Sequence, residues 1–331
     1  MMRRLAYVLT GLLVVVVGVL ALTFIPSNHY IVLPDKARPT DPLVRIPGEK
    51  SQDEEDIYMV DVRIGRANLL ERLFPGIQEG ADLLPERAIN PEGVSDRQRR
   101  QSSLNDMSRS QLVAITVALR ELGREVEVNG SGAEVVLVQP GSPADGVMEV
   151  GDVIVEAEGE EVESIDDLRR ALGDIEPGQE VELTVQRGDE RVEVTSDTQA
   201  SPDDPDRAVI GVQVQDALDF EFPVDIEIDA GAIGGPSAGL AFALDIVDEL
   251  GDDDIDRGRK IVATGELTLD GEVLPIGGVK QKAIGAREAG ADIFLVPDGN
   301  YEDARKAVDE DDLEIVPVSN LEEALSVLAA N

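Results

Sequence analysis

The spacing of hydrophobic and polar residues divides this chain into an N-terminal apolar run and two folded parts. Residues 5–25 carry no charged side chain and are long enough to cross a bilayer. The run is longer than the apolar part of a signal peptide, and no clear small-x-small site follows it, which favours a retained anchor over a cleaved leader. We therefore expect residues 1–25 to be a single-pass transmembrane helix in the cell membrane. Arg3 and Arg4 favour a cytoplasmic N-terminus and an extracytoplasmic remainder.

The segment after this run changes from a polar, proline-rich stretch to periodic patterns. Residues 26–56 contain several prolines among polar residues, which predicts a linker. β-Branched residues with partial alternation predict a strand over residues 57–64. Residues 75–104 lack such spacing and are expected to form a loop, whereas residues 108–122 place apolar side chains at helical intervals and predict a helix. We assign residues 57–123 to the first part of a larger domain.

A compact unit with its own pattern is expected over residues 126–198. Short β-branched runs predict strands, and Ser164 is placed to cap a helix with apolar residues at helical spacing. The segments Gly-Ser-Pro-Ala at 141–144 and Gly-Asp-Val-Ile at 151–154 stand in the order found in bacterial protease-associated PDZ domains, and the unit resembles that family. The expected fold of this unit is therefore a β-rich α+β domain.

The PDZ resemblance implies a peptide ligand that adds to the domain as an extra strand. We expect its groove between the strand around residues 134–138 and the helix at residues 164–172. The alternative is a structural insert that binds nothing, because a fold does not by itself imply a function.

Residues 207–331 alternate strand and helix patterns, which predicts an α/β arrangement. Within them, residues 234–240 read Gly-Gly-Pro-Ser-Ala-Gly-Leu. Glycines can adopt backbone angles closed to other residues, and Pro236 suits the first position of a helix. Apolar residues then recur at helical spacing as far as Leu250. We expect Ser237 on the first turn of this helix, where free N–H groups favour negative charge such as an oxyanion.

A serine nucleophile needs a base, and the composition limits the choice. The chain has one histidine, His29, close behind the apolar run, and no cysteine; this argues against a Ser-His-Asp triad and excludes a Cys-His pair. A lysine can serve when burial lowers its pKa. Lys280 and Lys282 lie downstream of the serine, and residues two apart point to different sides of a helix. Lys282 shares its face with Ala286 and Ala289, which could exclude water from an amine.

Three blocks of this region resemble the catalytic domain of Lon proteases. They are Pro-Ser-Ala-Gly at 236–239, Thr-Gly-Glu at 264–266 and Pro-Ile-Gly-Gly-Val-Lys-Gln-Lys-Ala at 275–283. Three ordered blocks are far more specific than one short motif. The resemblance covers roughly residues 209–331.

This resemblance implies a Ser-Lys dyad. Ser237 would be the nucleophile, Lys282 the general base, and Thr264 the hydroxyl that hydrogen-bonds the lysine. ATP-dependent members of the family usually carry an acidic residue three places before the serine, where this chain has Gly234. The structural alternative is that Ser237 only caps a helix and that Lys282 is a surface charge.

The expected architecture is an α/β (α+β) Lon-type proteolytic domain with an inserted PDZ domain and one N-terminal transmembrane helix. The resemblance implies a serine endopeptidase that acts on unfolded or tail-exposed protein substrates recruited by the PDZ domain, and it implies a ring-shaped homo-oligomer. No Gly-x-x-x-x-Gly-Lys-Ser/Thr run occurs. We therefore expect ATP-independent activity, and we expect no cofactor and no metal.

Charge narrows the range of partners. The formal net charge is −39, with 68 acidic residues, and a nucleic-acid backbone would be repelled. Protein or peptide partners that are neutral or basic remain. The principal alternative function is a non-catalytic, membrane-tethered PDZ adaptor. A trypsin-like PDZ protease is a second alternative, but its base would have to be His29.

Overall fold

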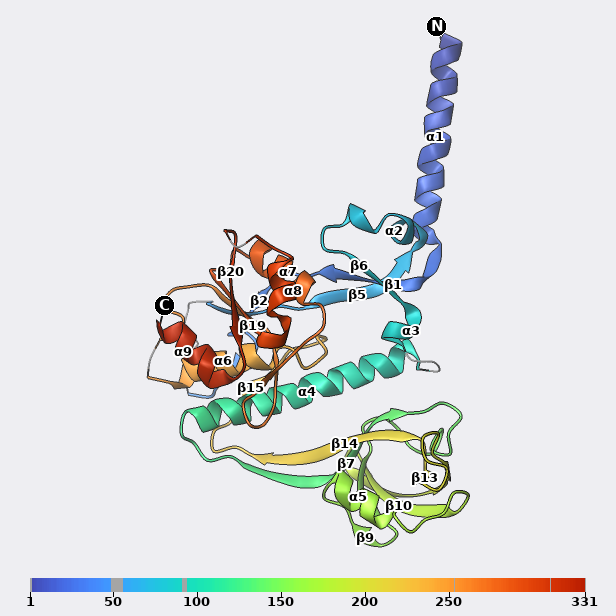
Figure 1. Cartoon of the computed structure of the whole chain (residues 1–331), viewed down its shortest axis with the longest axis vertical. Helices are drawn as coiled ribbons and strands as arrows, with labels where there is room; N and C mark the ends of the chain where they lie inside the picture. The colour runs from blue at the N-terminus through green and yellow to red at the C-terminus, as the bar shows by residue number, and fades with distance from the viewer. Residues whose placement is uncertain (1, 49–55, 91–93, 253, 310, 331) are drawn as a thin grey trace.

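A computed structural model describes residues 2–48, 56–90, 94–252, 254–309 and 311–330, with the side chains of residues 2–6 and 8 excepted. Helix α1 (Met2–Phe24) projects away from the rest of the molecule (Figure 1). Within the described ranges, no helix combines the length and the apolar content needed to span a bilayer. The transmembrane helix predicted over residues 1–25 is therefore not supported by this structure.

A mostly parallel sheet forms the centre of the larger domain. In the described part of the chain its strand order is β2-β4-β16-β19-β20, and only β2 is antiparallel to its neighbour. Successive side chains of a strand point to opposite faces, so Ile57 and Met59 enter one hydrophobic core while Tyr58 and Val60 enter the other. The strands are β2 (Arg38–Pro39), β4 (Ile57–Met59), β16 (Ile261–Ala263), β19 (Ile293–Pro297) and β20 (Glu314–Val318).

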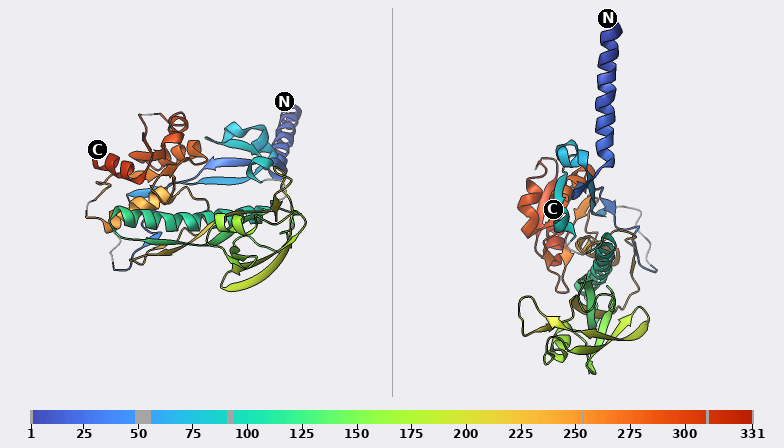
Figure 2. Two further views of the ribbon diagram at one scale, coloured as in Figure 1. Left: turned by 60° about the horizontal axis from the view of Figure 1, so that its bottom comes forward. Right: turned by 90° about the vertical axis from the view of Figure 1, so that its right-hand side faces the viewer.

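Helices cover both faces of this sheet (Figures 1 and 2). Apolar residues of α4, α6 and α9 belong to the first core, and those of α7 and α8 belong to the second. Burial on both faces explains why strands such as β19 read as continuous apolar runs in the sequence. The helices are α4 (Asp96–Glu121), α6 (Gly239–Leu250), α7 (Val279–Glu288), α8 (Tyr301–Arg305) and α9 (Leu321–Ala330).

Residues 26–56 are not a simple linker. Their described part contains β1, whose residues Tyr30, Ile31 and Val32 are buried, and β1 lies between β5 and β6 in a small sheet. Of the prolines that suggested a linker, Pro34 and Pro39 stand at strand ends, which tolerate proline, and Pro42 and Pro47 lie in turns. Residues 49–55 lie outside the described residues. This layer consists of β1 (Pro26–Pro34), β5 (Val62–Asn68), β6 (Asp82–Pro85), α2 (Leu69–Leu73), η1 (Pro75–Ile77) and α3 (Glu86–Ile89).

The loop predicted over residues 75–104 is also wrong, because its first half contains η1, β6 and α3 and its second half begins α4. Helix α4 begins at Asp96, twelve residues before the predicted start at Ser108. Ser95 and Gln98 form a capping box in which each side chain accepts from the other's backbone N–H. The first turns carry mostly polar and basic side chains, so hydrophobic spacing did not reveal them.

A second unit with a separate core follows α4. Its sheet has the order β11-β10-β8-β7-β14, with β9 paired to β8. Because α4 and the chain after residue 226 share one core, this unit is an insertion in the larger domain. Its elements are β7 (Glu127–Val138), β8 (Val153–Ala157), β9 (Glu160–Glu161), α5 (Ile165–Ala171), β10 (Glu180–Arg187), β11 (Glu190–Asp197) and β14 (Val212–Glu221).

Strand β14 corrects the predicted position of the peptide groove. It pairs antiparallel with β7 from Val212 opposite Val138 to Glu221 opposite Glu127. The edge of β7 at residues 134–138 is therefore paired with β14 and is not free for a peptide. The predicted domain boundary at residue 207 had assigned the residues of β14 to the other domain. Three short pairs complete the fold: β12 (Gln199–Ala200) with β13 (Ala208–Val209), β15 (Glu227–Ile228) with β3 (Val44–Arg45), and β17 (Glu266–Leu267) with β18 (Val273–Leu274).

Candidate active site

Ser237 lies in a turn immediately before α6. The helix begins at Gly239 with Ala238 as its N-cap, so Ser237 precedes the first helical turn on which the sequence had placed it. Gly235 adopts a φ of +91°, which L side chains rarely tolerate. The glycine therefore allows the turn in which the partly buried Ser237 lines the cavity.

The chain after β16 holds the Ser237 backbone. The carbonyl oxygen of Ser237 accepts hydrogen bonds from the N–H of Gly265, at 2.9 Å, and from Thr264 Oγ1, at 3.0 Å. Thr264 is fully buried at the carboxyl end of β16. The first two sequence blocks thus meet directly through these bonds.

Helix α7 carries Lys282, and two glycines let it pack closely. Gly278 caps the helix in the left-handed region, with a φ of +71°. A Cβ at Gly285 would lie 2.3 Å from the carbonyl oxygen of Asp35, so any side chain there would push α7 away from the segment after β1. This close approach encloses the lysine between α7 and the central sheet.

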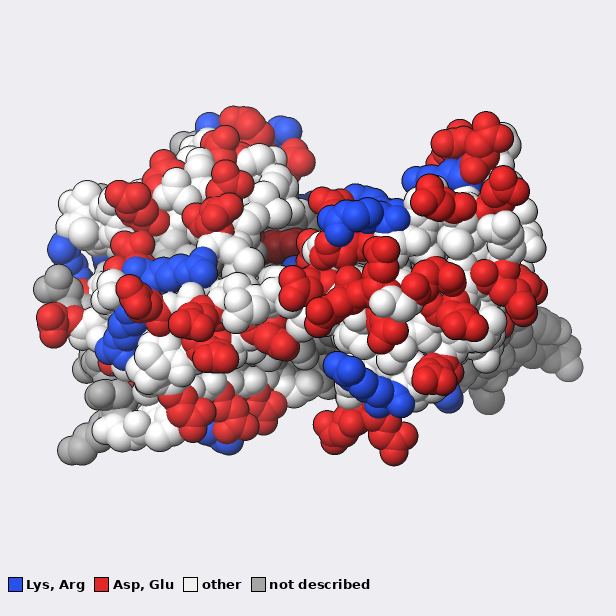
Figure 3. Space-filling view, turned by 90° about the horizontal axis from the view of Figure 1, so that it is seen from below, with Lys and Arg blue, Asp and Glu red and all other residues white. Residues whose placement is uncertain are grey.

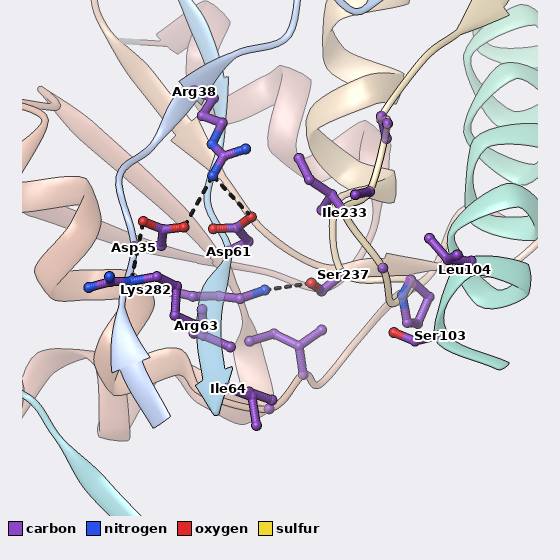
Figure 4. A pocket seen from close by; sticks show the side chains of 18 of the residues that line it. Asp35, Arg38, Asp61, Arg63, Ile64, Ser103, Leu104, Ile233, Ser237 and Lys282 are labelled. Carbon is purple, nitrogen blue, oxygen red and sulfur yellow. Dashed lines mark hydrogen bonds and ion pairs between the residues drawn. The ribbon is translucent and has the colours of Figure 1, made fainter. Parts of the chain in front are cut away.

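The three predicted residues meet at one point. Lys282 Nζ lies 2.5 Å from Ser237 Oγ and 3.0 Å from Thr264 Oγ1. The lysine side chain points from α7 toward Ser237, and both residues line one cavity (Figure 4). Lys282 is only 2% exposed. Such a burial is rare for lysine unless the amine has partners.

Burial also sets the protonation of this amine. Loss of hydration lowers the pKa of Lys282 to about 7, and the nearby Asp61 carboxylate opposes the shift. Near neutral pH a substantial fraction of the lysine is then an uncharged amine, which can accept a proton. A neutral amine within hydrogen-bond distance of a hydroxyl can activate that hydroxyl as a nucleophile.

The other candidate bases lie elsewhere. Lys280 Nζ forms an ion pair with Asp82 at 2.7 Å and is partly exposed. His29 Nδ1 lies 3.0 Å from Asn28 Oδ1, and His29 is not among the residues that line the cavity at Ser237. Among the described residues, Lys282 is therefore the basic side chain hydrogen-bonded to Ser237.

Two cavity residues were missed by sequence reasoning. The cavity has a volume of about 910 Å³, and Asp61 and Arg38 line it beside the lysine (Figure 4). Arg38 lies 3.9 Å from Asp61, and the second oxygen of this carboxylate, Oδ1, is buried with no hydrogen-bond partner among the described residues. Burial raises the pKa of Asp61. No motif in the sequence marked either residue.

Among the described residues, one acidic cluster could hold a metal ion. Carboxylate oxygens of Asp248, Asp254 and Asp256 lie within 4.8 Å of one another. Each of these residues also accepts a hydrogen bond from a backbone N–H in residues 255–258. The cluster is therefore accounted for by the turn that follows α6, and none of its members lines the cavity at Ser237.

The similarity to known proteins agrees with this geometry. Residues 208–330 match the model of the Lon protease (S16) C-terminal proteolytic domain, and residues 121–198 match the model of the PDZ domain. The Lon protease of Rickettsia bellii is 40% identical over 122 residues, which are 36% of this chain and 15% of that protein. The Lon protease of Roseiflexus castenholzii is 42% identical over 107 residues, 31% of this chain and 13% of that protein.

This chain thus spans about 15% or less of the length of these curated relatives. The crystal structure of the PDZ domain of an SdrC-like protein from Listeria monocytogenes is 22% identical, covers 25% of this chain and 87% of its own, and has a TM-score of 0.24, too low to carry an argument. The sequence similarities support a serine endopeptidase. The chain contains a Lon-type (S16) proteolytic domain, matched over residues 208–330, and a PDZ domain, matched over residues 121–198.

Proposed function

We propose that this chain is an ATP-independent serine endopeptidase in which Ser237 is the nucleophile and Lys282 the general base. The observation that carries the proposal is the buried amine 2.5 Å from Ser237 Oγ and 3.0 Å from Thr264 Oγ1. The similarity to Lon proteolytic domains over residues 208–330 supports it independently.

The mechanism follows from the protonation of the dyad. Neutral Lys282 accepts the hydroxyl proton as Ser237 Oγ attacks the carbonyl carbon of a peptide bond, and the resulting ammonium donates that proton to the leaving amine. Water then hydrolyses the acyl-enzyme, with Lys282 again accepting a proton. Thr264 donates to the Ser237 carbonyl oxygen and can accept from the amine, so it orients both partners.

The non-catalytic adaptor is the competing function. A scaffold gains nothing from a dehydrated lysine beside a hydroxyl, because burial of a cationic side chain opposes folding. The pairing of Ser237 with Lys282 therefore favours the enzyme.

Substitution of the dyad separates the two functions. Ser237→Ala and Lys282→Met should each abolish digestion of unfolded casein in the absence of nucleotide, a loss of at least about 1,000-fold, because dyad members act as a unit. Lys280→Met serves as the matched control, since this lysine pairs with Asp82 on the other side of α7, and it should digest casein normally. Undiminished digestion by the Ser237→Ala protein would leave the adaptor as the better description.

The pH profile should report the buried amine. Because only the neutral form accepts a proton, kcat/KM should rise with pH through about 7, the pKa of Lys282. Asp61→Asn removes a negative charge that favours the ammonium, so the pKa of Lys282 falls and the rising limb moves to lower pH. Asp225→Asn, an exposed change, is the control for a general loss of charge. A limb that moved to higher pH in Asp61→Asn would contradict the assignment of Lys282.

The PDZ domain is proposed to recruit substrates along the outer edge of β14. This strand ends the sheet, and α5 lies against it: Asp216 Oδ1 accepts from the N–H of Ile165, the first residue of α5. An extended peptide can add to such an edge. Acidic side chains dominate the face shown in Figure 3, which favours neutral or basic segments over nucleic acid.

Hydrogen exchange tests this binding edge. The Ser237→Ala chain should bind unfolded casein without cleaving it, and the amides of residues 212–216 should then exchange more slowly than in the free protein. The opposite edge of the same sheet, β11, provides an internal control whose exchange should not change. If the amides of β14 exchange at the same rate with and without casein, the proposal that this edge recruits substrates is wrong.

Membrane attachment through α1 remains a prediction from the sequence, and a ring-shaped homo-oligomer remains an implication of resemblance. Side chains such as Leu12, Leu13 and Val14 are more than half exposed on a helix that projects from the folded body (Figure 1). Exposed apolar surface of this extent is typical of interaction with lipid or protein.

Fractionation tests the attachment. The full chain should sediment with membranes after alkaline carbonate extraction, and a chain with Leu13→Arg and Val16→Arg should not, because charge inside the bilayer is unfavourable. Recovery of the unaltered chain in the supernatant would contradict attachment.

A further inference from the structure

The nucleophile turn rests on one face of α4. Ser103 and Ser110 are seven residues apart, which places them on the same side of the helix. The carbonyl oxygen of Ser103 accepts from the N–H of Gly235 at 2.7 Å, and Ser110 Oγ donates to the carbonyl oxygen of Pro236 at 2.8 Å. Ser110 is 5% exposed, so its hydroxyl has little access to water as an alternative partner.

This contact leaves no room at Gly234. A Cβ there would lie 2.4 Å from Ser103 Oγ and 3.0 Å from the Ser103 carbonyl oxygen. An acidic side chain three places before the serine would therefore require Ser103 Oγ to rotate away and the turn to shift by a few tenths of an ångström from the Ser103 carbonyl. The glycine at this position favours the close contact in which Gly235 N–H donates to Ser103 and Ser110 Oγ donates to Pro236.

The bond from Ser110 fixes the direction of the Ser237 N–H. The peptide unit between Pro236 and Ser237 is trans, so its N–H points opposite to its C=O. With the Pro236 carbonyl held by Ser110, the Ser237 N–H is turned away from α4. Among the described residues, this N–H has no hydrogen-bond acceptor, whereas the Ser237 carbonyl has two donors. Pro236 and Ser237 both line the cavity.

We infer that Ser110 is a positioning residue that holds the Pro236–Ser237 peptide unit so that the Ser237 N–H can donate to the oxyanion formed during acylation. The inference rests on the proposed endopeptidase function. As Oγ bonds to the carbonyl carbon, the carbonyl π electrons move to oxygen, and a fixed N–H stabilises that charge without reorganising. Loss of one such donor lowers kcat by about 100- to 1,000-fold in well-studied enzymes, and loosening it should have a smaller effect.

The test compares Ser110→Ala with a matched loss of a buried hydroxyl. Thr116 lies on the same helix, is fully buried, and donates to Leu112 within α4; Thr116→Val removes that hydroxyl without changing shape. Ser110→Ala should lower kcat for a fluorogenic peptide about 10-fold or more, with KM little changed. It should also weaken inhibition by a peptide boronic acid, whose serine adduct is tetrahedral and negatively charged, by a similar factor. Thr116→Val should leave both values within about twofold of the native chain.

A second variant applies if Ser110→Ala does not fold. In Gly239→Ala the new Cβ would lie 2.9 Å from Ser110 Oγ, displacing the hydroxyl while keeping the serine, and the same joint loss of kcat and boronate affinity is expected. The inference is overturned if the folded variant keeps native kcat and boronate affinity, or if Thr116→Val loses as much of both. A native chain without Ser237-dependent hydrolysis would overturn the proposed function itself, and the inference with it.

Discussion

The site depends on keeping water away from one amine. An ammonium group hidden from solvent loses hydration that few contacts replace, so the fold favours the neutral form of Lys282, whose pKa falls to about 7. A shift of that size corresponds to a penalty on the charged form on the order of 5 kcal/mol. Small residues allow this enclosure. Gly285 lets α7 approach the Asp35 carbonyl, and Ala286, one turn after Lys282, is fully buried. The reactivity of the amine is thus a property of how α7 packs on the sheet.

Sequence alone located the centre of this site because its residues stand in short, ordered blocks. Ser237 lies just before α6, Thr264 just after β16 and Lys282 in the first turn of α7, three elements whose sequence patterns are clear. The structure brings the three side chains within hydrogen-bond distance. The residues around this centre could not be predicted from the sequence. Asp61, in the link between β4 and β5, influences the lysine, and Arg38 on β2 pairs with Asp61. Both lie more than 200 residues before Lys282 in the chain, and a contact at that separation leaves no local signal.

The errors in the fold have related physical causes. The prolines of residues 26–48 suggested a linker, yet Pro26, Pro34 and Pro39 stand at strand ends, where a missing N–H is tolerated, and Pro42 and Pro47 stand in turns. The first turns of α4 are polar, and their helical state depends on the capping box at Ser95. The sequence of β14 predicts a strand but does not indicate the domain to which the strand belongs. Its pairing with β7 places it in the sheet of the inserted unit. Propensity identifies an element, but its neighbours in space follow from packing.

Helix α4 joins the two units through adjacent residues. Arg109 donates to the carbonyl oxygen of Asp216 on β14, and Ser110, the next residue, donates to Pro236 beside the nucleophile. Arg109 and Ser110 are consecutive residues within the hydrogen-bonded backbone of α4, so they move together. A displacement of β14 relative to the nucleophile turn must therefore break one of these hydrogen bonds or carry α4 with it. The edge available to a peptide and the turn that bears Ser237 are consequently held to the same piece of backbone, and the geometry of one constrains the geometry of the other.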